Sequence, residues 1–115
     1  MRIRESFDEF IARLPDRIQQ KGWLFRRVHF HSQAYFLCDK AGKVMVDFVG
    51  RYESLGRDWR HVLDKLGVQA ELPHRNPSQH QAWPEVYTPE TLRVVNQVYA
   101  ADFDTFGYER WESIP

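Results

Sequence analysis

The chain has 115 residues, of which 43% are hydrophobic and 15% aromatic, and its 16 basic residues (Lys and Arg) balance 16 acidic ones. This length predicts a single domain over residues 1–115, and the apolar content excludes an intrinsically disordered chain. A net charge of zero argues against nucleic acid or an anionic membrane as a partner, and the one cysteine, Cys38, excludes an internal disulfide.

The residue pattern predicts neither a membrane span nor a secretory signal. No apolar run reaches the length of a transmembrane helix, and the start of the chain, MRIRESFDEF, lacks the apolar core of a signal peptide. A lone thiol in an apolar run fits a reducing compartment and a buried, inert side chain. We therefore expect a cytoplasmic protein.

The first predicted element is a helix that begins at Ser6. Ser6 and Glu9 have the spacing of a capping box, in which side chains satisfy backbone N–H groups at the start of a helix. Pro15 is expected to end this helix. The predicted apolar face contains Phe7, Phe10, Ile11 and Leu14.

The next predicted elements are two strands that pair as a hairpin. Ala34–Cys38 is expected to be the first strand, and residues 39–42 the turn. Val44–Leu55 begins as a β-branched apolar run that ends at Gly50, which is typical of a strand buried on both faces. Tyr52 and Glu53 follow, so we expect polar groups at the sheet edge where ligands bind in open α/β folds.

Two helices and a long loop complete the prediction. Glu53–Gly67 has apolar residues at helical spacing, and Val68–Pro84 has no period. Thr88 is the expected N-cap of the last helix, which closes at Gly107. The expected fold class is therefore α/β or α+β, with one buried strand and a hairpin partner packed by about three helices.

Three groups of side chains are candidates for a site on their chemistry alone. His29 and His31 would face the same way on a strand, as metal ligands do, but no further ligand joins them, and we favour a structural role or an acceptor contact over a metal site. Residues 75–78 (Arg-Asn-Pro-Ser) suit an anion, although a simple Asn-Pro-Ser turn is the favoured interpretation. Asp102 and Asp104 do not face each other and are expected at the surface.

Six short motifs occur in order along the chain. They are Ser6-Phe7-x-x-Phe10, His29-Phe30-x-x-Gln33, Asp47-Phe48-Val49-Gly50-Arg51-Tyr52-Glu53-x-Leu55-x-x-Asp58, Leu72-Pro73-His74-x-Asn76-x-Ser78, Tyr87-Thr88-Pro89-Glu90 and Tyr99-x-x-Asp102-Phe103-x-x-Phe106-Gly107-Tyr108. In this order they resemble the carboxy-terminal half of the carbohydrate-type sulfotransferase family. The resemblance implies a P-loop-like fold that uses 3′-phosphoadenylyl sulfate as sulfuryl donor and a carbohydrate as acceptor.

The resemblance also implies roles for individual residues. Tyr52 would lie near the adenine of the donor, and Asn76 and Ser78 near its phosphate or the acceptor. His29 and Gln33 would lie toward the carbohydrate. The catalytic residue is otherwise unknown, and His29 is a candidate general base by its chemistry.

Two donor-binding elements of that family are not found in this sequence. One is a strand–loop–helix with a basic residue and Ser/Thr, and the other is an R-x-P-x-x-R…S segment. A donor with several negative charges needs such a preorganised cradle. Two hypotheses therefore stay open: the chain works with an amino-terminal half supplied by another chain or a longer reading frame, or it is a non-catalytic remnant or binding module that forms homo-oligomers. As part of a longer chain it would be membrane-associated or in the Golgi.

Overall fold

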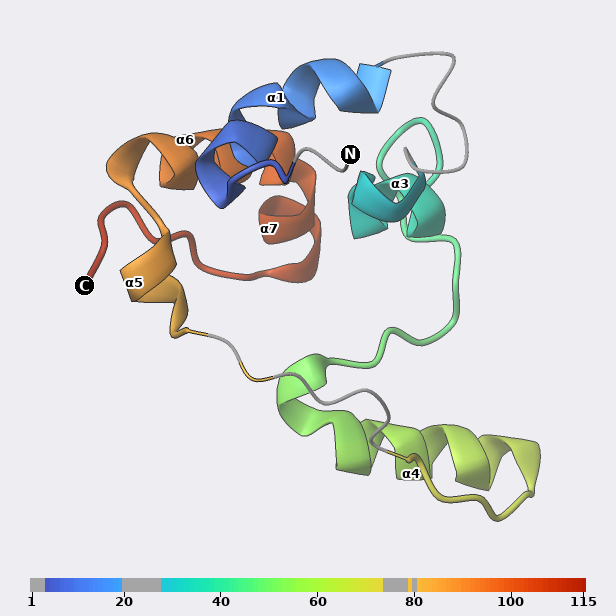
Figure 1. The fold of residues 1–115 in the computed structure, drawn as a ribbon. Coiled ribbons are helices and arrows are strands. Elements are labelled where there is room, and N and C mark those ends of the chain that lie inside the picture. Colours follow the sequence, from blue (N-terminus) through green and yellow to red (C-terminus); the bar gives the residue numbers. More distant parts are fainter. Residues whose placement is uncertain (1–3, 20–27, 74–78, 80) are drawn as a thin grey trace. The chain divides into compact units, whose positions relative to one another are not determined.

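The computed structural model describes residues 4–19, 28–73, 79 and 81–115, and this part of the chain is helical (Figure 1). The chain divides into two compact units, residues 1–45 with 81–115, and residues 46–80. The helices of the first unit are α1 (Phe7–Gln19), the 3-10 helix η2 (Val28–Phe30), α3 (Gln33–Leu37), α5 (Trp83–Val86), α6 (Pro89–Val98) and α7 (Ala100–Phe106). The second unit contains the 3-10 helix η3 (Tyr52–Ser54) and α4 (Leu55–Leu66).

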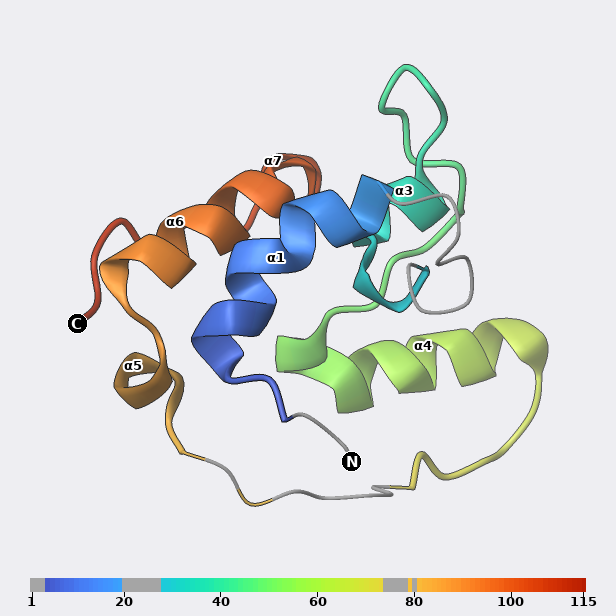
Figure 2. The same cartoon turned by 45° about the horizontal axis from the view of Figure 1, so that its top comes forward.

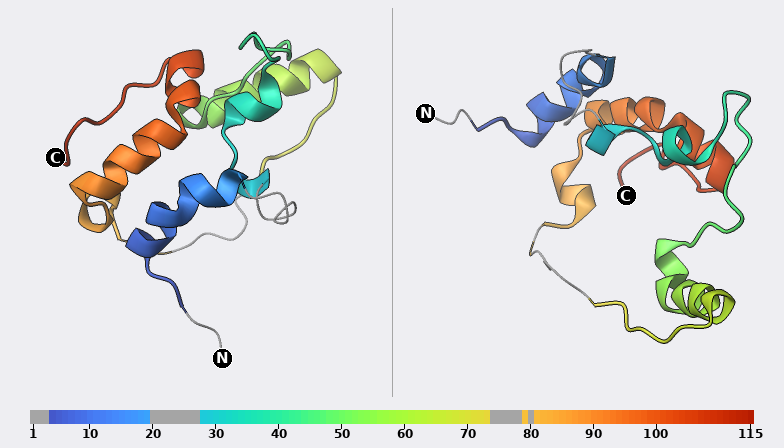
Figure 3. Two further views of the ribbon diagram at one scale, coloured as in Figure 1. Left: turned by 90° about the horizontal axis from the view of Figure 1, so that it is seen from above. Right: turned by 90° about the vertical axis from the view of Figure 1, so that its right-hand side faces the viewer.

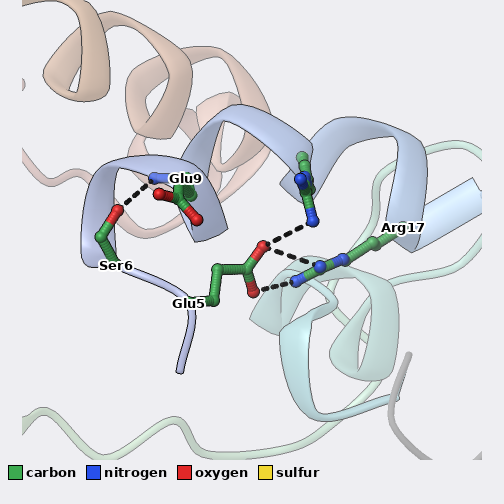
Figure 4. A network of polar contacts seen from close by, with 5 residues as sticks. Glu5, Ser6, Glu9 and Arg17 are labelled. Atoms are coloured by element: carbon green, nitrogen blue, oxygen red, sulfur yellow. Dashed lines mark hydrogen bonds and ion pairs between the residues drawn. The ribbon is translucent and has the colours of Figure 1, made fainter. Parts of the chain in front are cut away.

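Helix α1 begins where the sequence predicts but does not end at Pro15. The Ser6 hydroxyl accepts the backbone N–H of Glu9 at 3.2 Å, which caps the helix. The expected end is wrong, since the helix continues past Pro15 to Gln19. Arg17, after the proline, donates two hydrogen bonds of 2.7 and 2.8 Å to Glu5, before the helix (Figure 4). This pair ties the last turn to the start of the helix.

The core of the first unit lies between α1 and α6, which run side by side (Figure 2). Leu14 of α1 is 2% exposed, and Leu92 of α6 is also buried. Thr88 and Thr91 cap α6 reciprocally, each hydroxyl accepting the other residue's backbone N–H. The predicted last helix is divided by Tyr99 into α6 and α7, and Gly107, with φ of 72°, ends it as expected.

The predicted buried strand and its hairpin partner are wrong for the described residues. Ala34–Cys38 lies mostly in helix α3, and the described residues contain no sheet, only an isolated bridge between Cys38 and Val44. The apolar run after this bridge is exposed rather than buried, with Met45 65% exposed and Val46 and Phe48 each 42% exposed. A strand buried on both faces needs paired neighbours and covering layers, and the two described units supply neither.

Only the turn of the expected hairpin is present. The Asp39 carboxylate accepts the backbone N–H groups of Ala41 and Lys43, each at 2.9 Å, and Gly42 has a φ of 86° that favours glycine. The turn therefore forms from local chemistry. Two backbone hydrogen bonds flank the bridge, from the N–H of Asp39 to the carbonyl of Lys43 at 2.9 Å and from the N–H of Met45 to the carbonyl of Leu37 at 2.7 Å. No ladder extends beyond them, because the segment before the turn is helical from Gln33 to Leu37.

The second unit is built on α4, the helix that the sequence predicts best. Gly67 ends it in the left-handed conformation, with φ of 67°. The Trp59 indole donates a hydrogen bond of 3.2 Å to the carbonyl of Ala70, which folds the following segment back along the helix. None of the helices in the described ranges is long and apolar enough to cross a bilayer.

Candidate functional site

In the second unit, the carboxylate of Asp58 fixes the backbone on both sides of Tyr52. Its Oδ2 accepts the backbone N–H of Arg51 at 2.8 Å and the hydroxyl of Ser54 at 2.8 Å. Asp58 is 9% exposed, whereas the Tyr52 side chain between these two partners is 86% exposed. The short turn η3 therefore presents an aromatic ring to solvent on a backbone that a buried carboxylate holds in place.

The charge of Asp58 is stabilised by these donors. The backbone N–H of Arg51 is the largest cause that holds the pKa of Asp58 below its usual 3.8, and the Ser54 hydroxyl is the second. Burial opposes them, and the Arg57 guanidinium, with Nε 3.5 Å from Oδ1, adds attraction. A carboxylate held charged in this way positions the turn and is poorly suited to accept a substrate proton at neutral pH.

In the first unit, Asp102 of α7 and Tyr99, which lies between α6 and α7, hold the stretch that carries His29 and Gln33. The Asp102 carboxylate accepts the backbone N–H of Gln33 at 2.9 Å and that of Ala34 at 2.7 Å. The hydroxyl of Tyr99 donates to the carbonyl of Phe30 at 2.8 Å. These three hydrogen bonds connect positions 68 or 69 apart and fasten η2 and the start of α3 to α7, which α3 contacts (Figure 3).

Tyr99 stays protonated in this arrangement and can act as the donor. Burial is the main cause that raises its pKa above the usual 10, and the negative charges of Asp102 and of an ionised Tyr87 act in the same direction. The sequence predicts Asp102 as a surface residue and indicates no contact for it. The one available signal was the Tyr99-x-x-Asp102 spacing, which does not reveal a contact 69 positions away.

The five residues proposed from sequence fall into three places. His29, in η2, and Gln33, the first residue of α3, are both exposed and lie on the stretch of the first unit that Asp102 and Tyr99 hold. Tyr52 belongs to the second unit. Asn76 and Ser78, with the rest of the predicted anion loop, lie outside the described residues.

A metal site at the two histidines has no support in the described residues. No group of three or more His, Cys, Asp or Glu there is placed to hold a metal ion. The His31 ring instead stacks on the ring of Tyr35, with centroids 4.0 Å apart and planes 11° apart. Stacking of this kind is a packing role for His31.

The sequence matches a protein-family model. A model of the family described as "Sulfotransferase family" matches residues 1–109, which contain both the Tyr52 turn and the His29–Gln33 stretch. No curated protein and no solved structure matches the chain significantly.

Proposed function

The chain belongs to the sulfotransferase family, and we propose that it takes part in sulfuryl transfer from 3′-phosphoadenylyl sulfate to a carbohydrate hydroxyl. The donor, when bound, supplies the sulfuryl group, and residues of this chain bind and orient the reactants. In this proposal Tyr52 faces the adenine, Asn76 and Ser78 the phosphates or the acceptor, and His29 and Gln33 the carbohydrate.

The observation that carries the proposal is the exposed ring of Tyr52 on its fixed turn. Purine bases stack on aromatic side chains, and each such contact contributes about 1–3 kcal/mol. A ring that is 86% exposed, on a backbone held by Asp58, is preorganised for this contact. Arg57 and Arg60, in the first half of α4, are exposed cations of the same unit and suit the charge of a phosphorylated nucleotide.

On the acceptor side, the fixed stretch of the first unit presents two polar side chains. The Gln33 amide can bind sugar hydroxyls as donor and acceptor. The His29 imidazole is the side chain best suited to take the proton that the attacking hydroxyl loses. Because the donor carries several negative charges, we propose that its phosphosulfate is held by elements outside these 115 residues, in another chain or a longer reading frame, and that these residues alone bind nucleotide weakly.

Titration with 3′-phosphoadenosine 5′-phosphate tests the donor side of this proposal. We expect saturable shifts of backbone NMR signals in residues 51–58, with a dissociation constant on the order of a millimolar. Tyr52→Phe, which keeps the ring, should bind as the wild type does, whereas Tyr52→Ala should weaken binding roughly tenfold.

Because Tyr52 is exposed, neither variant should affect folding. Shifts that miss residues 51–58, or that are equal in the Ala variant, would contradict the role of Tyr52. No binding by the chain at several millimolar nucleotide would overturn the proposed donor site.

A further inference from the structure

Helix α3 carries two exposed aromatic side chains in adjacent positions. Tyr35 is 56% exposed and Phe36 54% exposed, and their ring centroids lie 5.2 Å apart with planes at 89°. His31 stacks on Tyr35 and also meets the Phe36 ring edge-on, with centroids 6.5 Å apart. The three rings therefore support one another in a defined geometry while about half of the Tyr35 and Phe36 surface stays open.

The helix that carries these rings is held at its start by side chains. A helix of five residues is not stable by itself in water. Here Ser32 accepts the backbone N–H of Tyr35 at 3.2 Å, and Asp102 accepts those of Gln33 and Ala34. The backbone beneath Tyr35 and Phe36 is thus fixed from α7, which limits the conformational entropy that a ligand would have to remove.

We propose that Tyr35 and Phe36 form an aromatic platform for one pyranose ring of the carbohydrate acceptor, a role that rests on the proposed sulfuryl transfer to carbohydrate. Because the two planes lie at 89°, one aromatic ring stacks on the face of the sugar and the other meets its edge. Sugars such as galactosides have one face lined by C–H groups, and this face packs on aromatic rings while the hydroxyl groups at its rim seek hydrogen bonds. Gln33, on the same helix, and His29, just before it, are exposed polar side chains that can supply those hydrogen bonds.

The charge and size of the platform favour this occupant over others. Residues 28–38 contain no Lys, Arg, Asp or Glu, so the stretch offers no charge to a nucleic acid or a phosphorylated peptide. Two half-exposed rings present about 200 Å² of surface. A stable dimer buries about 800 Å² on each partner, so these rings alone are too small to hold a second copy, and their area suits a single sugar ring.

Titration of the whole chain with methyl β-D-galactopyranoside, followed by NMR, tests the platform. We expect ring signals of Tyr35 and Phe36 to shift, with weak affinity, and glycerol at the same molarity, which has no ring face, to leave them unchanged. Tyr35→Phe should keep the affinity, and Tyr35→Leu or Phe36→Leu should lower it roughly three- to tenfold.

Trp111→Leu is the matched control, because Trp111 is also 54% exposed and lies in the same unit but outside α3. Equal loss of affinity in this variant, or no shift of the Tyr35 and Phe36 signals, would overturn the platform. Broadening of those signals with protein concentration, without sugar, would show that a second copy covers them and would also overturn it.

Nucleotide titration of the same samples separates this inference from the proposed function. Nucleotide binding at residues 51–58 without sugar binding would contradict the proposed platform and support the proposed donor site. Sugar binding at Tyr35 and Phe36 without nucleotide binding would support the proposed platform and contradict the proposed donor site.

Discussion

The carboxylate of Asp102 accepts the backbone N–H of Gln33 at 2.9 Å, although 69 positions separate the two residues. The neighbouring N–H of Ala34 bonds to the other oxygen of the same carboxylate at 2.7 Å. Asp102 thus satisfies two N–H groups that the first turn of any helix leaves without a partner in the helix. It does so from a different helix, so the conformation of the proposed acceptor stretch depends on the position of α7.

Asp102→Ala should destabilise the first unit by about 1–2 kcal/mol, since the exposed N–H of Gln33 and the partly buried N–H of Ala34 lose their acceptor. Asp102→Asn should have about half this effect, because the amide keeps one acceptor oxygen. Urea unfolding measures the difference, and amide exchange should rise first at Gln33 and Ala34. Asp104→Asn is the control: this side chain is 69% exposed, and its loss should change stability by about 0.5 kcal/mol or less. Equal effects at positions 102 and 104 would contradict the clamp.

Because of Asp58, the free energy of unfolding of the second unit should depend on pH in the acid range. The folded pKa of Asp58 lies below the usual 3.8, so its contribution is full above that value and is lost as the pH falls through the lower, folded pKa. Asp58→Asn should be less stable than wild type at neutral pH, and the gap should narrow below about pH 4. The Trp59 indole N–H signal, which reports the bond to Ala70, follows unfolding of this unit. A gap that stays constant down to pH 2 would contradict the assigned role.

Four helix ends could be predicted from sequence because each is decided by residues next to it, whereas Pro15, the expected end of α1, lies inside that helix. Ser6, Thr88, Gly67 and Gly107 all act as the sequence indicates. Helix α3 is not predicted from sequence although Ser32 is a local N-cap, because the residues of the helix are aromatic and apolar and the Asp102 carboxylate that accepts two of its N–H groups is distant in sequence. The buried strand predicted for Val44–Gly50 is wrong for a related reason. The composition of this segment fits a buried strand, but burial requires neighbouring strands and covering layers that the described units do not provide.

In the candidate site, too, the sequence indicates individual residues but not the contacts that depend on the fold. Tyr52 is exposed, and its role as a contact residue stays a prediction; the motif that contains it also contains Asp58, six positions later. The hydrogen bond between Asp58 and the backbone of Arg51 could not be inferred from spacing alone, because it depends on the bend that η3 makes between them. Motifs thus gave candidate residues, and the structure gave the contacts that hold them.

Glu5→Gln should lower the thermal midpoint of the first unit, and the effect should shrink as salt is added. Glu5 pairs with the two terminal guanidinium nitrogens of Arg17 (Figure 4), and its Oε1 lies 3.3 Å from Nη1 of Arg13. The hydrogen bond to Arg17 is the main cause that lowers the pKa of Glu5. Because both partners are near the surface, salt should screen most of the attraction. A difference between Gln and Glu that is unchanged at high salt would show that packing, rather than charge, holds this network.

Two glycines of α4 should respond in opposite directions to the same substitution. Gly67 ends the helix with φ of 67°, where a Cβ meets no atom within 4 Å but the backbone itself is strained for other residues. Gly67→Ala should therefore cost about 1 kcal/mol, and Gly67→Asn less, because asparagine tolerates this conformation.

Gly56 lies in the first turn of α4, and a Cβ there also meets nothing within 4 Å. Gly56→Ala should stabilise the second unit by about 0.5 kcal/mol, because alanine restricts the unfolded chain and has a higher helix propensity. Urea unfolding followed through the Trp59 indole signal compares the two variants in one unit. The pair separates backbone conformation from side-chain contact, since neither new methyl group touches a neighbour. Destabilisation of similar size at both positions would mean that α4 ends elsewhere than at Gly67, or that its first turn is not helical.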